Sequence, residues 1–299
     1  MSEKSDQRRL RLTLRQLEVF AALARTGSTR AAADRVARSQ SAASTALAAL
    51  ESALGAPLFD RVGRRLIVNE NGRALLPLTI SLLDQAGELQ SLFTREPPAP
   101  LRIASSFTIG EYLLPGLIAR WKQDHPQGTA RLAIGNTSEV IDAVVSFDVD
   151  VGFIEGRQRH PDLVVRRWLA DELVIFAAPG HPLAGRRVGT AELAAAPWIL
   201  REPGSGTREA SDRWLLDKAG PLRLELELGS NEAVKRVVAA GVGIGCLSRH
   251  AVVEALAGGW LVEVRTRLPK ATRALSIVVH RKRRPGRTAE AFVASCLAG

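Results

Sequence analysis

Cysteine is scarce in this sequence, which has two in 299 residues, Cys246 and Cys296. They are far apart and form neither a CxxC pair nor the spacing of metal ligands, so neither a disulfide framework nor a zinc module is indicated. Cys246 stands in the apolar run GVGIGCLS, which is typical of a small buried hydrophobic side chain. We expect no disulfide and no metal.

Long apolar runs are also missing. No window approaches the roughly 18 apolar residues that indicate a membrane-spanning helix. The first residues, MSEKSDQRRLRLTLRQ, are polar and lack the apolar core of a signal peptide. We therefore expect a cytoplasmic protein with no membrane partner.

Recognisable catalytic arrangements are absent as well. No Ser/His/Asp order, carboxylate pair or metal-ligand spacing stands out, and the glycine turn REPGSGTR lacks the GxxxxGK[ST] pattern of a phosphate-binding loop. The histidines are scattered in loops or beside prolines: His125, His160, His181, His250 and His280. We expect neither an enzyme nor a cofactor.

What the sequence does have is enough apolar material for a core and an excess of positive charge. Hydrophobic residues make up 46% and charged residues 24%, and the length fits two or three compact units. With 41 Lys and Arg against 31 Asp and Glu, the net charge is +10. This favours a polyanionic partner such as nucleic acid or a membrane surface, although solvated arginines would give the same balance.

Residues 1–68 have the pattern of three short helices. Thr13 and Gln16 form a capping box at the start of the first helix, and Gly27 ends it. Ser28 and Ser39 then cap a second and a third helix, of which the third, QSAASTALAALESAL, has one apolar face. Two helices joined by a tight turn indicate a helix-turn-helix. The following stretch, APLFDRVGRRLIVN, reads as a hairpin wing.

The third helix contains no lysine or arginine, so its outward face offers only neutral groups. Gln can pair with adenine, and Ser and Thr can bond to base edges or phosphate. The candidates for DNA contact on this helix are Gln40, Ser41, Ser44 and Thr45. Neutralisation of phosphates dominates affinity, and it would come from flanking arginines: Arg30, Arg38, Arg61, Arg64 and Arg65. The alternative is an ordinary helix surface with solvated charges.

Residues 69–96 repeat apolar side chains at spacings of three and four. About 24 residues at 1.5 Å each predict a rod of about 36 Å. The seam favours pairing with a second copy, and an amphipathic helix on its own core is the alternative. Pro77 is expected to kink this helix or mark its start. EPPAP, residues 96–100, reads as an extended linker. The seam residues are Leu75, Leu78, Leu82, Ala86, Leu89 and Phe93.

Residues 97–299 alternate short apolar strands with helices, which indicates parallel α/β structure. About 200 residues suffice for two small sheets with a cleft between them. With this third segment, the order of parts resembles the LysR-type transcriptional regulators over essentially the full chain. The residues that carry the resemblance are LRQLEVFAALARTGSTRAAADRVARSQSAASTALAALESALGAPLFDR.

The resemblance implies a fold and a set of partners. It implies an α/β protein with an N-terminal winged helix-turn-helix, a dimerising linker helix and a two-lobed regulatory domain like a periplasmic binding protein. It also implies a dimer of dimers on promoter DNA, with a metabolite that changes the DNA bend or the contact with RNA polymerase. Such folds cross between lobes twice, here near Ala178 and Lys270, giving lobe I as 100–177 and 271–299 and lobe II as 178–270. At Ser41 and near Thr45 the sequence departs from the proline and the basic residue of many members.

Four strand-to-helix junctions of the third segment carry small polar residues. Each would present backbone N–H groups and hydroxyls at a helix N-terminus, where anions bind, and such junctions line the crevice of α/β folds. Each is also an ordinary helix cap when taken alone. The candidates for effector contact are Ser105, Ser106, Thr108, Asn136, Thr137, Gly204, Ser205, Thr207 and Asn231, with Arg201 before the glycine turn. We expect Glu155, at the end of VDVGFIEG, to border the cleft and to reject fully charged ligands.

The turn REPGSGTR resembles a stretch of the sulfite-responsive and Rubisco-operon regulators. That resemblance implies a small anionic effector, either an oxyanion or a phosphorylated metabolite. A second basic cluster, HRKRRPGR (280–287), is expected to be a solvated loop of the regulatory domain, with a nucleic-acid patch as the alternative. For the whole chain, an α/β enzyme with a DNA-binding head for autoregulation remains the alternative function.

Overall fold

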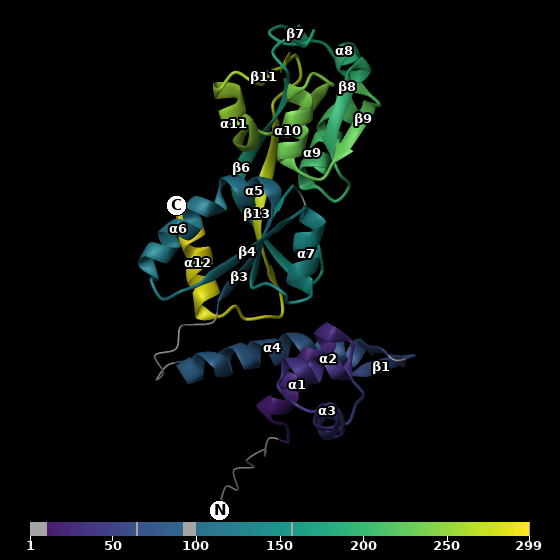
Figure 1. Cartoon of the computed structure of the whole chain (residues 1–299), viewed down its shortest axis with the longest axis vertical. Coiled ribbons are helices and arrows are strands. Elements are labelled where there is room, and N and C mark those ends of the chain that lie inside the picture. Colours follow the sequence, from purple (N-terminus) through teal and green to yellow (C-terminus); the bar gives the residue numbers. More distant parts are fainter. Residues whose placement is uncertain (1–10, 64, 92–99, 157, 299) are drawn as a thin grey trace, which may run out of the picture. The chain divides into compact units, whose positions relative to one another are not determined.

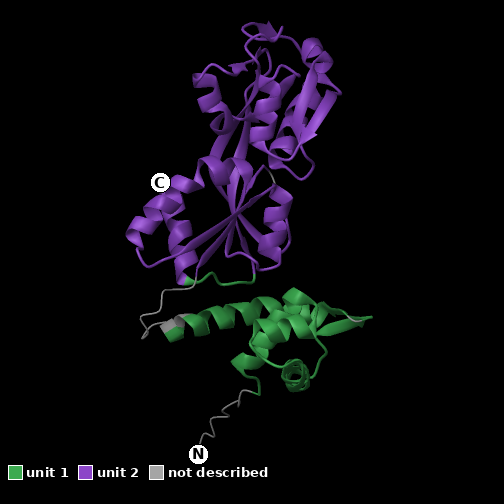
Figure 2. Cartoon of the chain, in the orientation of Figure 1, with its two compact units in different colours: residues 1–96, 282–286 green, residues 97–281, 287–299 purple. Residues whose placement is uncertain are grey.

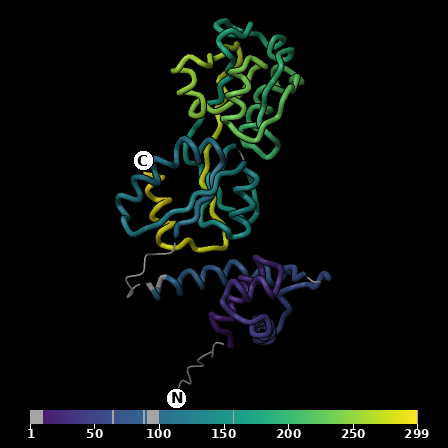
Figure 3. Tube along the Cα trace, viewed as in Figure 1, coloured from purple at the N-terminus to yellow at the C-terminus, as the bar shows by residue number. Residues whose placement is uncertain are grey.

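The computed structural model describes residues 11–63, 65–91, 100–156 and 158–298. The chain divides into two compact units, which Figure 2 shows in green and purple. Unit 1 comprises residues 1–96 and 282–286, and unit 2 comprises 97–281 and 287–299. The course of the chain through each unit can be followed in Figures 1 and 3.

Unit 1 begins with a trihelical head and a hairpin. Its elements are α1 (Leu14–Thr26), α2 (Thr29–Arg35), α3 (Gln40–Leu54), β1 (Phe59–Val62) and β2 (Arg65–Val68). The capping box of Thr13 and Gln16 is present, and Gly27 ends α1 with a φ of 63°, in the left-handed region that glycine adopts without strain. Strands β1 and β2 pair antiparallel, so the predicted wing is a hairpin.

Helix α4 (Glu70–Ser91) follows the hairpin and begins seven residues before Pro77, so Pro77 does not mark its start. Ile80 is buried, and Leu83 packs against the core of the head. Leu78, Leu82 and Leu89 lie at i, i+4 and i+11 and are 58%, 47% and 66% exposed, which leaves an apolar stripe on the outer face. Phe93 and most of the EPPAP stretch lie outside the described residues.

The basic cluster at 280–287 is not uniformly solvated. The Arg283 side chain is 5% exposed, and its guanidinium lies 2.6 Å from the Asp84 carboxylate of α4, within unit 1. The prediction of a solvated loop on the regulatory domain is therefore wrong for Arg283, because a buried guanidinium requires a carboxylate partner and Asp84 supplies one.

Unit 2 contains two lobes, each with its own cores. Lobe I is built from β3 (Leu101–Ser106), α5 (Phe107–Tyr112), α6 (Leu114–Asp124), β4 (Ala130–Gly135), α7 (Thr137–Val145), β5 (Val151–Glu155) and α12 (Arg287–Ala298). Lobe II is built from β7 (Arg187–Val188), α8 (Thr190–Ala195), β8 (Pro197–Arg201), α9 (Gly206–Ala219), β9 (Arg223–Leu228), α10 (Asn231–Ala239), β10 (Ile244–Ser248), α11 (Arg249–Ala257), β11 (Val262–Glu263) and β12 (Arg265–Thr266).

Two long strands, β6 (Leu163–Ala177) and β13 (Ala271–His280), run antiparallel to each other through both lobes. They join the lobes into one hydrogen-bonded sheet of order β4-β3-β5-β13-β6-β10-β8-β9. In β6, Leu169 packs in a lobe I core whereas Leu173 packs in a lobe II core. The first crossing therefore lies inside β6 and before the predicted Ala178, because the strand continues unbroken from one core to the other. None of the helices in the described residues is long and apolar enough to cross a membrane.

Candidate nucleic-acid interface and inter-lobe site

Helix α3 presents the face that the sequence predicts. Ala43, Leu47 and Leu50 are buried against the head, and the opposite face is exposed. The exposed residues include all four candidates on this helix: Gln40, Ser41, Ser44 and Thr45. The Gln40 side chain donates to Thr29 Oγ1 at 3.2 Å, which ties the start of α3 to α2. The outward face thus holds short neutral side chains that allow a close approach to a groove.

The candidate arginines precede or follow α3 in the sequence. Arg30 lies in α2, Arg38 just before α3, Arg61 in β1 and Arg65 in β2, and all four are exposed. No carboxylate of the described residues forms an ion pair with any of these four. Arg64 lies outside the described residues. Cations without a carboxylate partner remain available to phosphate groups.

Between the lobes of unit 2, Glu155 is the acceptor of a buried network. The Thr108 backbone N–H of lobe I donates to Glu155 Oε1 at 3.1 Å, and the Thr207 hydroxyl of lobe II donates to Oε2 at 2.7 Å. Arg273 Nη1 lies 2.6 Å from Oε2. Glu155 is 2% exposed, so it is an internal anion and does not border a cleft as the sequence suggested. Because Glu155 accepts hydrogen bonds from the Thr108 N–H and the Thr207 hydroxyl, these donors of two predicted effector contacts are already used within the protein.

Arg273 completes the network on the crossing strand β13. Its Nε lies 2.7 Å from Asp171 Oδ2, and the Ser248 hydroxyl donates to Asp171 Oδ1 at 2.7 Å. Burial alone would raise the pKa of Glu155, but the Arg273 charge, the hydrogen bonds from Thr207 and Thr108 and the nearby Ser106 hydroxyl lower it to about 2. Sequence reasoning missed Arg273 and Asp171. Arg273 is the one arginine of β13, but β6 also contains Arg166, Arg167 and Glu172, so the sequence did not single out Asp171.

Arg201 forms a second contact between the lobes. Its Cζ lies 4.5 Å from the ring centroid of Phe107 in lobe I, and its Nη1 donates to Asn231 Oδ1 at 2.7 Å. Glu202 accepts from Arg201 Nε and Nη2 at 2.7 and 2.8 Å. The guanidinium is thus paired within its own lobe, and its charge is already compensated.

Two predicted site residues near Arg201 have buried donors whose contacts with carboxylates fall short of hydrogen-bond geometry: Ser106 toward Glu155, and Asn231 toward Glu111. Ser106 Oγ and Asn231 Nδ2 are buried and have no hydrogen-bond partner of normal geometry among the described residues. Ser106 ends β3 in lobe I, and Asn231 starts α10 in lobe II. An unpaired buried donor costs about 1 to 3 kcal/mol, so each of these atoms is suited to a bound polar group.

The remaining candidates make contacts within the fold around this region. Ser138 N–H donates to Gly204 O at 3.2 Å, which brings the junction beginning at Asn136 against the glycine turn. Gly206 lies so close to the Glu155 backbone that a Cβ would stand 2.5 Å from its carbonyl oxygen. The other candidates are committed: Asn136 and Ser205 cap α7 and α9, Thr137 faces the Glu155 N–H at 3.5 Å, and Ser105 donates to the Ser106 carbonyl.

Two family models match the chain, and together they cover the head and the two lobes. One is the bacterial regulatory helix-turn-helix protein of the lysR family, over residues 14–73, and the other is the LysR substrate binding domain, over residues 94–299. Among the residues that the structure describes, no group of His, Cys, Asp and Glu side chains is arranged to hold a metal ion.

Curated relatives and solved structures agree with this match. The chain is 48% identical over 287 residues to the uncharacterized HTH-type transcriptional regulator YeiE of Escherichia coli, covering 96% of this chain and 98% of that protein. It is 32% identical over 247 residues to the RuBisCO operon transcriptional regulator of Allochromatium vinosum, covering 81% and 82%.

Two solved structures share the architecture. A full-length OxyR variant of Pseudomonas aeruginosa superposes with a TM-score of 0.74 at 23% identity, over 95% of this chain and 94% of that chain. The regulatory domain of CcmR from Synechocystis, in complex with 2-PG, gives a TM-score of 0.62 at 28% identity, over 67% and 96%. With the head, the linker helix and the two-lobed domain in this order, the chain belongs to the LysR family of transcriptional regulators.

Proposed function

We propose that this regulator responds to a small anion, either an inorganic oxyanion or a phosphorylated metabolite, bound between the lobes of unit 2. The observation that carries the proposal is the pair of buried donors Ser106 Oγ and Asn231 Nδ2, one from each lobe, neither of which forms a hydrogen bond of normal geometry among the described residues. A ligand that accepts hydrogen bonds from both would join the lobes. Arg201 and Arg273 are already paired with carboxylates, so neutral side chains and backbone N–H groups of α7, α9 and α10 would provide the recognition.

The comparison with CcmR supports a phosphorylated ligand. Its regulatory domain carries 2-PG (2-phosphoglycolate), a phosphate and a carboxylate on a two-carbon frame. The RuBisCO operon regulator among the relatives is consistent with the same branch of the family.

On promoter DNA we assign the α3 side chains Gln40, Ser41, Ser44 and Thr45 to base edges. The exposed arginines of α2 and the wing would bind the phosphates. Because α3 offers no basic side chain, much of the specificity would rest on DNA shape and deformation. The exposed leucine stripe of α4 would pair two copies, and pairs of such dimers would contact two promoter subsites and RNA polymerase in the cytoplasm.

A thermal-shift series on the full chain tests the effector. The probes are sulfite, sulfate, inorganic phosphate and 2-phosphoglycolate, with chloride at equal ionic strength as the reference. We expect one of these anions to raise the Tm of the chain, and to raise it further as the anion concentration increases. Ser106→Ala and Asn231→Ala should abolish the shift, while Ser295→Ala, which removes an exposed hydroxyl on α12, should retain it. An equal shift in all three variants would reject this site.

A further inference from the structure

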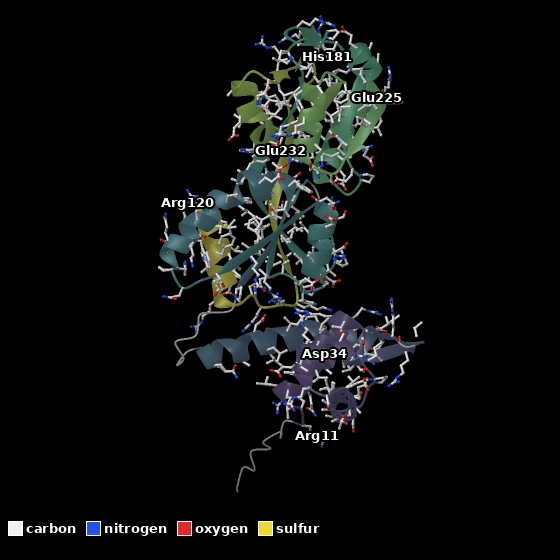
Figure 4. All side chains as sticks on the ribbon, in the orientation of Figure 1. Arg11, Asp34, Arg120, His181, Glu225 and Glu232 are labelled. Atoms are coloured by element: carbon white, nitrogen blue, oxygen red, sulfur yellow. The ribbon has the colours of Figure 1, made fainter. Side chains whose placement is uncertain are left out.

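Tyr112 belongs to lobe I by sequence but packs in lobe II. It is the last residue of α5, and its ring lies against the apolar core formed by Val234, Val238 and other lobe II residues. Its hydroxyl donates to Glu232 Oε1 of α10 at 3.0 Å. Figure 4 shows Glu232, which it labels, in the part of α10 that faces α5. One side chain thus crosses the boundary with both apolar and polar contacts.

Lys235 adds a charge to this contact. It is 5% exposed and forms an ion pair with Glu232. Its Nζ lies 5.4 Å from the Tyr112 ring centroid, 5.8 Å from that of Trp260, and 3.2 Å from the Tyr112 hydroxyl oxygen. A buried ammonium is costly unless it is paired and surrounded by such groups. Removal of Tyr112 from this place would therefore leave Lys235 with fewer partners.

The phenol remains a donor under all ordinary conditions. Burial and then the neighbouring Glu111 and Glu232 carboxylates raise the pKa of Tyr112 far above its usual range. Tyr112 is also the only tyrosine in the chain, so any tyrosine signal reports this position alone.

Helix α5 connects this contact to the proposed effector site. Ser106, whose buried hydroxyl lacks a hydrogen bond of normal geometry, directly precedes α5, and Tyr112 ends it, about 9 Å further along for six helical residues. The ring of Phe107, the first residue of α5, lies against the Arg201 guanidinium of lobe II. A single rigid turn-and-a-half of helix is therefore held by lobe II at both ends.

We propose that Tyr112 is an inter-lobe latch, a positioning residue that holds α5 against α10 and thereby keeps the two lobes together around the effector. Its link to the effector rests on the proposed function above, whereas the latch itself concerns only the lobes. A ligand that joins the lobes binds more weakly when the joined state is less populated.

The latch is tested by fluorine NMR of the full chain labelled with 3-fluorotyrosine, which gives one resonance. We expect it to lie away from its position in the urea-unfolded chain. Glu232→Ala should move it toward that position, and Glu232→Gln should move it less. The control Gln158→Ala removes a different inter-lobe hydrogen bond, 2.7 Å to Glu209, and should leave the resonance in place. An unchanged resonance in folded Glu232→Ala and Glu232→Gln would overturn the latch.

The coupling is tested with Tyr112→Phe, which keeps the ring and removes the hydroxyl. We expect its affinity for the tightest-binding anion of the thermal-shift series to fall roughly three- to tenfold, the effect of one lost hydrogen bond. An affinity equal to that of the unaltered chain would overturn the coupling. If no anion of the series bound the unaltered chain, the proposed effector class would fail, while the fluorine resonance would still decide the latch.

Discussion

Arg273 Nη1 lies 2.6 Å from Glu155 Oε2, although 118 residues separate the two in the sequence. Both side chains are buried, and Arg273 also pairs with Asp171 at 2.7 Å. The pair lies where the crossing strand β13 meets β5, with Leu275 opposite Glu155. Because Thr108 of lobe I and Thr207 of lobe II both donate to Glu155, the network fixes the two lobes at one point.

Replacing Arg273 should destabilise unit 2 strongly. Arg273→Met leaves Glu155 and Asp171 as buried carboxylates without their cation, which we expect to cost about 3 to 5 kcal/mol. The measurement is urea unfolding of the full chain followed by tryptophan fluorescence. The control Arg265→Met, at an exposed position of β12, should change the free energy of unfolding by less than about 0.5 kcal/mol. Equal stabilities of the two variants would show that the pair contributes nothing.

The same network predicts a dependence on acid. The pKa of Glu155 is lowered to about 2, so its contribution to stability is present above its ordinary value near 4.5 and is lost as the pH falls toward 2. Glu155→Gln should lose less stability than the unaltered chain between pH 4.5 and pH 2. Urea midpoints measured across this interval test the difference. Parallel pH profiles would mean that Glu155 has an ordinary pKa.

Two changes in unit 1 should separate base recognition from phosphate binding. Thr45→Ala should reduce the ratio of specific to random DNA binding, since Thr45 lies on the outward face of α3. Arg65→Ala should weaken binding to both DNAs and lower the slope of log K against log salt by about 0.9. Fluorescence anisotropy over a salt series measures both quantities, with Arg120→Ala of α6 as an exposed control. The division of roles fails if both variants lose affinity equally on the two DNAs.

The leucine stripe of α4 should govern self-association. Leu82→Glu places a charge in the middle of the stripe and should shift the chain toward monomers, as light scattering after size exclusion would show. Gly87→Glu adds the same charge on the opposite face, where a Cβ meets nothing within 4 Å, and should leave the mass unchanged. If Leu82→Glu retained the mass of the unaltered chain, the stripe would not be the interface.

Much of unit 1 was predictable because its signals are local. The capping box of Thr13 and Gln16, the glycine stop at Gly27 and the spacing of apolar residues in α3 each act within a few residues. The alternation of strands and helices likewise predicted an α/β regulatory domain. The junction at Ser105, Ser106 and Thr108 predicted the start of α5, but not the break at Leu113 that separates it from α6.

The sequence by itself therefore determined the helices of the head, the wing, the order of the domains and the outward face of α3. Only the tertiary structure decided which polar side chains form hydrogen bonds or ion pairs within the fold and which lack hydrogen bonds of normal geometry. Glu155 and Thr207 read as site residues but are committed to Arg273, whereas the buried donors of Ser106 and Asn231 form no hydrogen bond of normal geometry. The physical reason is distance along the chain. Partners such as Glu155 and Arg273, or Tyr112 and Glu232, meet only through strand register and lobe packing, and no local pattern encodes either.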